Sequence, residues 1–269
     1  MTRPRVSYLV AATQRSGSTL LCRALADTGV AGRPEEYLLT GPPEAFPPGW
    51  GFWEHGLFAQ GHADMDREGY LELVFRLGTT PNGVFGAKLM WNNVPWVLEK
   101  LWELPRFREL DRASTFQELF PNLRVIHVVR RDRVRQAVSW ARAAQDGVWV
   151  VSGTEPAAPV AEPVYTYEFI SGLEGLLVEG EREWPAFCAE LHVTPLTVVY
   201  EELVDPASYA PTIHAGLAYL GVDGPGVAIR EPRTDRQADA INDDWVRRYE
   251  ADRRSRVTRT ESTSTSEPS

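Results

Sequence analysis

The stretch VSYLVAATQRSGSTLLCRAL, residues 6–25, decides the fold predicted for this chain. Residues 6–12 form a short apolar run with the composition of a buried strand. A turn rich in Gly and Ser follows at once, and after it apolar residues recur at helical spacing. The stretch therefore predicts a strand, a loop and a helix in direct succession. The helical stripe consists of Leu20, Leu21, Ala24 and Leu25.

The same alternation recurs along the chain. Apolar runs at residues 84–90 and 123–129 each follow a turn signal that contains Pro and Asn. Asp132 is a good N-cap for a helix that reaches about Gln145, and residues 196–200 form another strand-like run. Strands that alternate with helices predict an α/β fold with a P-loop-like parallel sheet flanked by helices. Further helical patterns cover residues 167–191 and 209–220.

Length and composition indicate an ordinary globular protein. Of the 269 residues, 43% are hydrophobic and 24% are charged. Since α/β chains of this length commonly form one core, we expect a single domain over residues 1–251. Residues 252–269 are charged or small and polar, and we expect a disordered tail there. The Pro-rich segments 41–61 and 154–163 are predicted to be loops that carry specificity.

Charge and cysteine content exclude several classes of protein. The formal net charge of -9 has the wrong sign for general adhesion to nucleic acid or to an anionic membrane. The sequence shows neither a signal-peptide core nor an apolar run of transmembrane length. Cys22 and Cys188 lack metal-ligand spacing and are too few for a disulfide framework. We therefore expect a cytoplasmic protein with no nucleic-acid partner, no membrane insertion and no metal site.

The loop after the first strand, QRSGST at residues 14–19, is a candidate anion site. Free backbone N–H groups and the helix dipole attract phosphate or sulfate at such a junction. The loop offers Arg15 in place of the lysine of an ATP-binding P-loop, so an anion without metal fits better than a triphosphate with Mg²⁺. Taken alone, the loop could equally be a Ser/Gly turn that caps a helix.

A second basic segment follows the third predicted strand. Arg130 and Arg131 stand at the strand's carboxyl end, where open α/β sheets bind ligands. An arginine fork suits a phosphate, and Ser139, two helical turns later, can share it. Because Arg133 and Arg135 continue the run of charge, a solvated basic helix is the alternative interpretation.

Together the two segments resemble the sulfotransferases that use 3′-phosphoadenosine 5′-phosphosulfate (PAPS). In that family a 5′-phosphosulfate loop follows the first strand, and an arginine and a serine hold the 3′-phosphate. More narrowly, the chain looks like the bacterial trehalose 2-sulfotransferase type. The resemblance implies a sulfotransferase fold, PAPS as donor, a carbohydrate-like acceptor such as trehalose sulfated at its 2-hydroxyl, and a homodimer. It rests on YLVAATQRSGSTLL, GVAGRPEEYL, TPNGVFGAKLMWN, RRDRVRQAVSWARA and RQADAINDDWVRRYEAD.

The resemblance also implies which residues hold the donor. The 3′-phosphate is expected at Arg131 and Ser139, with Arg130 as the alternative arginine. Arg236 and Gln237 match the family's last block, where a loop can close over the nucleotide. The loop residues expected to contact the donor are Arg15, Ser16, Gly17, Ser18 and Thr19.

In that family the general base is a glutamate just after the first helix, and Glu36 occupies the matching place. The acceptor hydroxyl must lose its proton as the new S–O bond forms, and a positioned carboxylate can take it. Glu35 is the neighbouring candidate, and a surface Glu pair is the plain alternative. Arg15 and the loop amides are expected to stabilise charge during in-line transfer.

Three further residues are candidates for the site. Lys88 lies on an otherwise apolar strand, and it resembles the strand lysine of other sulfotransferases. Its catalytic role stands beside the alternative that its stem reaches to water at the strand's end. Trp53 and Trp91 flank the presumed acceptor side and could bind a sugar ring, although buried tryptophans are more often core residues.

Two other functions compete with sulfuryl transfer. A P-loop-type small-molecule kinase would need a loop lysine and carboxylates for Mg²⁺, and the QRSGST loop argues against it. A non-catalytic nucleotide-binding module would keep the loop and lack turnover. Substitution of Glu36 separates that module from an enzyme, because only an enzyme loses turnover while it keeps nucleotide binding.

Overall fold

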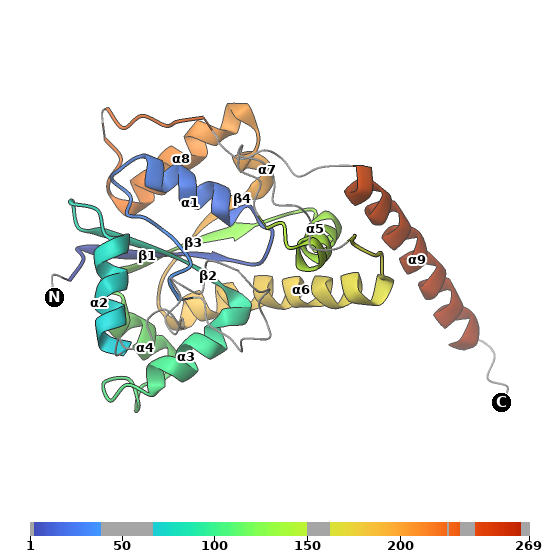
Figure 1. Ribbon diagram of the computed structural model, residues 1–269, viewed down its shortest axis with the longest axis horizontal. Coiled ribbons are helices and arrows are strands. Elements are labelled where there is room, and N and C mark those ends of the chain that lie inside the picture. The colour runs from blue at the N-terminus through green and yellow to red at the C-terminus, as the bar shows by residue number, and fades with distance from the viewer. Residues whose placement is uncertain (1–2, 39–66, 150–161, 225, 232–239, 265–269) are drawn as a thin grey trace. The chain divides into compact units, whose positions relative to one another are not determined.

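A computed structural model of the chain describes residues 3–38, 67–149, 162–224, 226–231 and 240–264. The chain divides into two compact units, of which the first comprises residues 1–131 and 178–232 and the second the remainder. Each unit is described by itself, with element labels as in Figure 1. Among the helices of the described residues, none combines the length and apolar character that crossing a membrane would require.

The first unit is built on a sheet of four strands, all parallel, in the order β2-β1-β3-β4. The chain leaves β1 toward β2 on one side and leaves β3 toward β4 on the other. The carboxyl ends of β1 and β3 therefore form a topological switch point, where open α/β sheets bind ligands. The strands are β1 (Val6–Ala12), β2 (Val84–Met90), β3 (Leu123–Val129) and β4 (Leu196–Val199).

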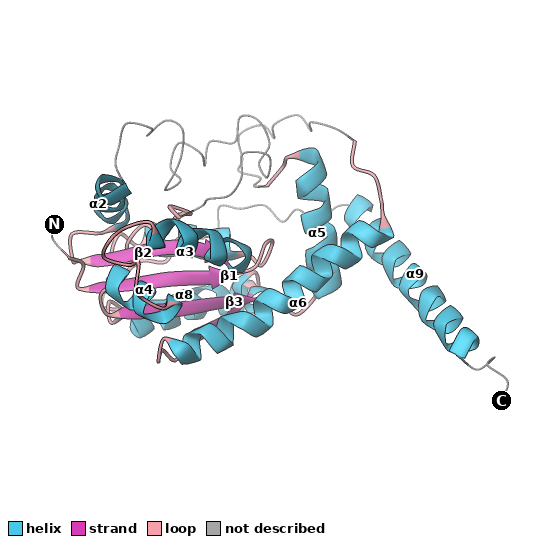
Figure 2. Cartoon of the chain, turned by 90° about the horizontal axis from the view of Figure 1, so that it is seen from below, coloured by secondary structure: helices cyan, strands magenta, loops and turns pink. Residues whose placement is uncertain are grey.

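Helices cover both faces of this sheet. In Figure 2, α3 and α4 lie in front of the magenta strands and α8 lies behind them. The helices of the first unit are α1 (Ser18–Asp27), α2 (Arg67–Gly78), the 3-10 helix η4 (Trp91–Asn93), α3 (Val94–Trp102), α4 (Arg112–Leu119), α7 (Tyr200–Leu203) and α8 (Pro206–Leu220). The long helix α6 (Tyr167–Glu190) begins in the second unit and ends in the first.

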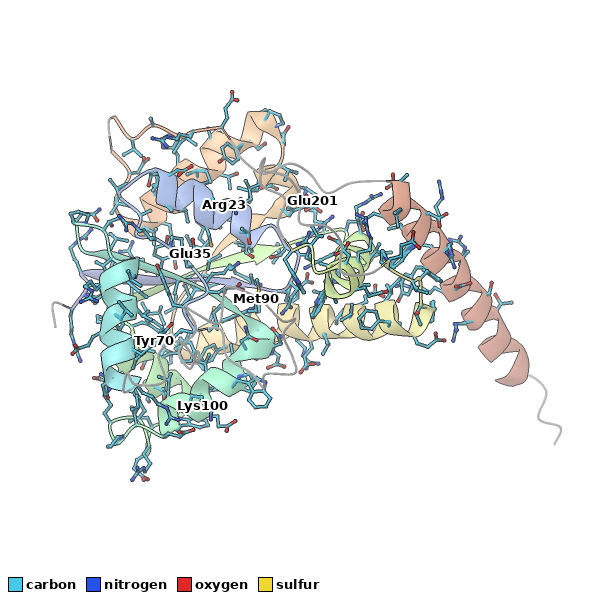
Figure 3. The ribbon with its side chains drawn as sticks, in the orientation of Figure 1. Arg23, Glu35, Tyr70, Met90, Lys100 and Glu201 are labelled. Atoms are coloured by element: carbon cyan, nitrogen blue, oxygen red, sulfur yellow. The ribbon has the colours of Figure 1, made fainter. Side chains whose placement is uncertain are left out.

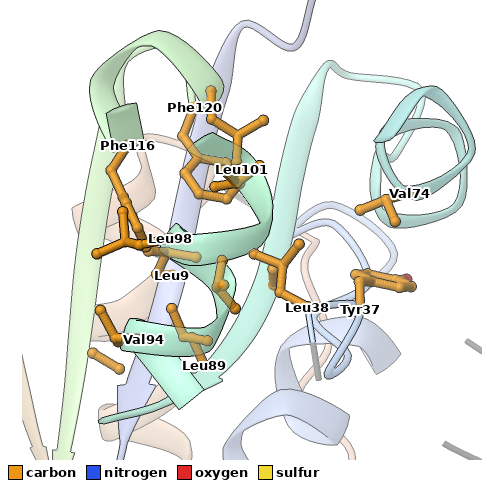
Figure 4. Packing of buried hydrophobic residues seen from close by; sticks show 14 of the residues in the cluster. Leu9, Tyr37, Leu38, Val74, Leu89, Val94, Leu98, Leu101, Phe116 and Phe120 are labelled. Atoms are coloured by element: carbon orange, nitrogen blue, oxygen red, sulfur yellow. The ribbon is translucent and has the colours of Figure 1, made fainter. Parts of the chain in front are cut away.

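One face of the sheet packs against α2, α3, α4 and the end of α6 (Figure 4). Side chains of alternate strand residues, such as Leu9, Phe85 and Val125, meet Phe116 of α4 and Trp184 of α6 in this core. The period of two follows from the pleat, which sends successive side chains to opposite faces. The Trp184 indole N–H donates to the carbonyl of Ala12 over 3.0 Å, which fixes α6 to the end of β1.

The opposite face packs against α1 and α8. Tyr8 and Val10 of β1 meet Leu21 of α1 and Leu217 of α8 in a second core. The Tyr8 hydroxyl is buried, and it donates to the carbonyl of Ala31 over 2.6 Å. This hydrogen bond ties the segment after α1 to the sheet, which brings the Glu-Glu pair that follows it close to β2.

The second unit packs α5 (Arg133–Asp146), the start of α6 and α9 (Ala240–Ser264) around Ile170, Trp245 and Tyr249. The Asp132 carboxylate caps α5 by accepting the backbone N–H of Arg135 over 2.9 Å, as the sequence predicted. The structure differs from the sequence prediction at residues 252–264, where α9 continues into the expected tail.

Contacts with the rest of the second unit explain this difference. Arg256 pairs with Glu168 over 2.5 Å and lies over the Tyr167 ring at 4.1 Å, and Tyr165 donates to Asp252 over 2.7 Å. Anchors of this kind hold a polar segment in a helix although it carries no apolar stripe of its own. The remaining tail residues, 265–269, lie outside the described residues.

The structure confirms the predicted α/β class and the parallel sheet. The predicted strands at residues 6–12, 84–90 and 123–129 are confirmed at their bounds, while Tyr200 begins a helix instead of ending the fourth strand. The sequence analysis did not predict α2, α3 or α4. Segment 41–61 and most of segment 154–163 lie outside the described residues.

Candidate functional site

The loop between β1 and α1 has an unusual backbone. Arg15 has a φ of 61° and Gly17 a φ of 89°, both in the left-handed region that residues other than glycine seldom adopt. A Cβ at Gly17 would lie 2.4 Å from a ring carbon of Tyr200, the residue that directly follows β4. Only glycine satisfies both the backbone angle and this close approach, so the loop's path is tightly specified.

The start of α1 meets the chemical requirements of an anion site. Ser16 is fully buried in the loop, and its hydroxyl oxygen has no hydrogen-bond partner among the described residues. No side chain caps α1, and its first turn carries no acidic residue. Backbone N–H groups at such a helix start, together with the helix dipole, favour a bound phosphate or sulfate. A phosphate or sulfate oxygen would supply the partner that Ser16 lacks.

A buried ion pair lies beside the same helix. The Lys88 ammonium on β2 stands 3.4 Å from a Glu36 carboxylate oxygen and donates to the Thr19 hydroxyl of α1 over 3.1 Å. The side chains of Lys88 and Glu36 are 7% and 11% exposed. Charges in such a water-excluded environment interact far more strongly than at the surface, and burial of an unpaired ammonium would cost much free energy. The cluster brings three sequence-predicted residues together.

The structure separates Glu36 from its neighbour. Glu35 pairs with β2 through its backbone, because its carbonyl accepts the Lys88 backbone N–H over 2.9 Å, and its side chain is exposed. Figure 3 shows Glu35 and Met90 near the sheet and Lys100 on α3. The extended backbone then sends the side chain of Glu36 the other way, toward Lys88. Of the two glutamates, Glu36 is the one beside the anion loop.

Cys22 of α1 lies close to this cluster. Burial raises the pKa of its thiol to about 12, and the nearby Lys88 ammonium opposes this effect, while Glu35 and Glu36 reinforce it. The thiol is therefore neutral at physiological pH and poorly nucleophilic. Both cysteines are free and buried, in agreement with the absence of a disulfide framework predicted from the sequence.

The two arginines after β3 have different surroundings. The Arg130 guanidinium stacks on the Tyr200 ring at 4.3 Å and donates to the carbonyl of Arg15 over 3.1 Å, so it touches the anion loop. Arg131 is largely exposed and pairs with Glu202 over 2.7 Å, while its backbone N–H donates to Glu201 over 3.2 Å. Arg131 closes the first unit and Ser139 belongs to the second, so their joint contact with a phosphate stays a prediction.

The other predicted residues fall into two groups. Trp91 is partly buried, with its ring 5.1 Å from that of Trp184 in an edge-on arrangement. Trp53, Arg236 and Gln237 lie outside the described residues. In the part of the chain that the structure describes, no group of three or more His, Cys, Asp and Glu side chains is placed to hold a metal ion.

Sequence reasoning missed two contacts of the loop. Tyr200 packs on Gly17 and under Arg130, and the only signal for it was its place at the end of a predicted strand. The Gln14 amide donates to Asn92 over 2.6 Å, which joins the loop to the residues after β2. Neither pairing follows from spacing, because the partners are far apart in the sequence.

The fold and this loop define an α/β protein with a candidate anion site at the carboxyl ends of parallel strands. The family model of the Stf0 sulphotransferases matches residues 7–252, and the chain belongs to that family. It is therefore a sulfotransferase. A trehalose 2-sulfotransferase of Mycolicibacterium smegmatis is 34% identical over 91% of this chain and 95% of its own length. A trehalose 2-sulfotransferase of Mycobacterium tuberculosis is 33% identical over 94% of this chain and 97% of its own length.

Proposed function

We propose that this enzyme transfers a sulfuryl group from PAPS to a hydroxyl of a small carbohydrate, with the 2-hydroxyl of trehalose as the first candidate. The observation that carries the proposal is the Glu36 carboxylate, which stands next to the helix that begins at the anion loop. The names of the two relatives support trehalose as the acceptor.

The residues around the loop fit the donor. The Ser16 hydroxyl and the uncapped N–H groups of α1 would hold the 5′-phosphosulfate, and the left-handed backbone of Gly17 sets the path of the loop that presents them. Arg15 would stabilise negative charge there, with Ser18 and Thr19 at the start of the helix. The 3′-phosphate is assigned to Arg131 and Ser139, with Arg130 as the alternative arginine, and Arg236 and Gln237 are assigned to other contacts with the nucleotide.

Bound PAPS would supply a sulfuryl group whose bond to the 5′-phosphate oxygen breaks as a bond to the acceptor oxygen forms. Glu36 would take the acceptor's hydroxyl proton, so that the products are a sulfate ester and 3′-phosphoadenosine 5′-phosphate (PAP). Positioning and charge stabilisation would provide most of the rate. Trp91, together with Trp53, is assigned to the acceptor's sugar rings, because flat apolar rings with polar edges suit carbohydrates.

Calorimetric titration tests the donor assignment. Purified protein is titrated with PAP without metal and, in parallel, with ATP and Mg²⁺. Binding of PAP alone supports the proposal, and binding of only Mg-ATP would favour the kinase alternative.

An acceptor screen then tests the substrate. The enzyme is incubated with PAPS and trehalose, maltose or glucose, and the products are separated and weighed by mass spectrometry. A sulfated disaccharide formed from trehalose but not from maltose supports the assignment. PAP binding without turnover of any hydroxyl compound would point to the non-catalytic module.

A further inference from the structure

Lys88 is unusual among the basic residues of this chain both in its residue type and in its burial. The sequence contains two lysines, Lys88 and Lys100, and all its other Lys+Arg residues are arginines. Lys100 lies at the surface, where it pairs with Glu103 over 3.0 Å. Lys88 is only 6% exposed, on a strand whose other side chains are apolar or glycine. An ammonium is a compact point charge, and it can serve two partners in a space too small for a guanidinium fork.

The partners of Lys88 come from two different elements. Thr19 stands at the start of α1, directly behind the anion loop, and Glu36 stands on the segment that follows α1. The other ionisable groups near Lys88 and Glu36 are the neutral Cys22 thiol of α1 and the exposed Glu35. Within this set, Lys88 is the cation that faces the Glu36 carboxylate.

We propose that Lys88 is the positioning residue that holds the Glu36 carboxylate and couples it, through Thr19, to occupancy of the anion loop. The proposal rests on the function proposed above, in which Glu36 is the base and the loop holds the donor. Lys88 then acts through two other groups and contacts neither the sulfuryl group nor the acceptor.

Two physical consequences follow from this arrangement. The ammonium holds the Glu36 carboxylate in place beside the first turn of α1. An anion bound at the loop would contact the first turn of α1, where the Thr19 hydroxyl accepts the hydrogen bond of the Lys88 ammonium. Donor binding and readiness of the base are thereby linked.

The scarcity of lysine makes a direct test possible. Protein labelled with a stable isotope at its lysine side chains gives two lysine signals in NMR, and Lys100→Met assigns them. We expect the Lys88 signal to shift when PAP is added without metal and to shift in Glu36→Gln, while the Lys100 signal stays in place. Because Thr19 is also an expected donor contact, Thr19→Val is measured at a PAP concentration that calorimetry shows to saturate it. The PAP-induced shift of Lys88 should then be at least halved, and Thr19→Ser should restore it.

Kinetics supply the second test. In Lys88→Met, kcat should fall by about tenfold to 100-fold, since a misplaced catalytic group costs up to about this much, while KM for PAPS changes less than about threefold. Lys100→Met is the matched control and should leave both unchanged.

The possible results separate the two proposals. A Lys88 signal that responds neither to PAP nor to Glu36→Gln overturns the positioning role, as does a Lys88→Met enzyme with unchanged kcat. If PAP does not bind, the proposed donor and the coupling both fail, whereas a response to Glu36→Gln would still support the ion pair. Thermal unfolding of Lys88→Met and of the Glu36→Gln/Lys88→Met double variant checks that each variant is folded.

Discussion

A basic side chain lies near the carboxyl end of both β2 and β3, but the one on β2 is buried and the one after β3 is exposed to water. Lys88 on β2 is nearly dry and lies between Glu36 and Thr19. Arg131 after β3 is 64% exposed and pairs with Glu202, which is itself half exposed. Coulomb interactions are strong in a low-dielectric interior and are screened at the surface. Substitutions in the buried ion pair should therefore have larger effects than substitutions in the exposed one.

Among the predicted effects, the loss of activity on removal of Glu36, the proposed base and the partner of the buried Lys88, should be the largest. We expect Glu36→Gln to lower kcat by about 10²-fold to 10⁴-fold, the range typical of a lost general base, with PAP affinity nearly unchanged. Single-turnover kinetics with PAPS and calorimetry with PAP measure the two quantities. The matched variant Glu35→Gln should lose less than about threefold, because its carboxylate is exposed and water screens its interactions. Equal losses in both variants would contradict the assignment.

The loop itself should be the next most sensitive feature. Gly17→Ala would force a Cβ into the Tyr200 ring at a left-handed φ of 89°, and we expect PAP affinity to fall by at least about tenfold. Gly29→Ala is the control, since Gly29 is also left-handed (φ 72°) but has open space around it. Unchanged PAP affinity in Gly17→Ala, measured by calorimetry, would show that the loop's path does not matter for the donor.

The sequence predicts elements best where one segment carries its own pattern. Residues 6–12, 84–90 and 123–129 are mostly apolar, as is typical of strands in a sheet covered on both faces, and their bounds could be read directly. Helices such as α2 and α4 have weaker stripes, and their core contacts, such as those of Phe116, come from tertiary packing that spacing does not encode.

The residues of the candidate site likewise divide into those that a local sequence pattern predicts and those that only long-range contacts identify. Ser16 and Gly17 carry a local loop signature, whereas the choice of Glu36 over Glu35 depended on a resemblance until the contact with Lys88 was known. The stacking of Arg130 on Tyr200 joins residues of two different strand ends, and no local pattern predicts it. Local motifs therefore identify the kind of ligand, and long-range pairing decides which side chains face it.

A buried titratable group on β3, His127, should make the stability of the fold depend on pH, with an effect of intermediate size. Burial lowers the pKa of His127 to about 4, below its ordinary value of 6.5, so the folded protein keeps this imidazole neutral. Below pH 6.5 the unfolded chain takes up a proton that the folded chain refuses, and stability falls as the pH drops toward 4. We expect this group to cost about 1 to 3 kcal/mol over that window.

Urea unfolding at several pH values measures the effect of His127. In His127→Leu the loss of stability between pH 6.5 and 4 should be smaller than in the parent chain. His192→Asn serves as the control, because His192 is exposed and its left-handed φ of 54° suits asparagine. A parent-like pH dependence in His127→Leu would mean that other groups cause the acid sensitivity.

The smallest effect should be a change in PAP affinity on substitution of Glu202, which lies by the exposed end of β3. This change can decide whether Arg130 or Arg131 binds the 3′-phosphate. Glu202 holds the Arg131 guanidinium, so it competes with any phosphate for that side chain. If Arg131 binds the 3′-phosphate, Glu202→Gln should raise PAP affinity by about twofold to fivefold, the size expected for release of an exposed ion pair, and the gain should shrink in high salt. If Arg130 binds that phosphate, Glu202→Gln should leave the affinity unchanged and Arg130→Met should weaken it, since Glu202 holds Arg131 while Arg130 stacks on Tyr200 and donates to Arg15. Calorimetry with PAP at two salt concentrations distinguishes these results, and adenosine 5′-phosphate, which lacks the 3′-phosphate, is the ligand control for both variants.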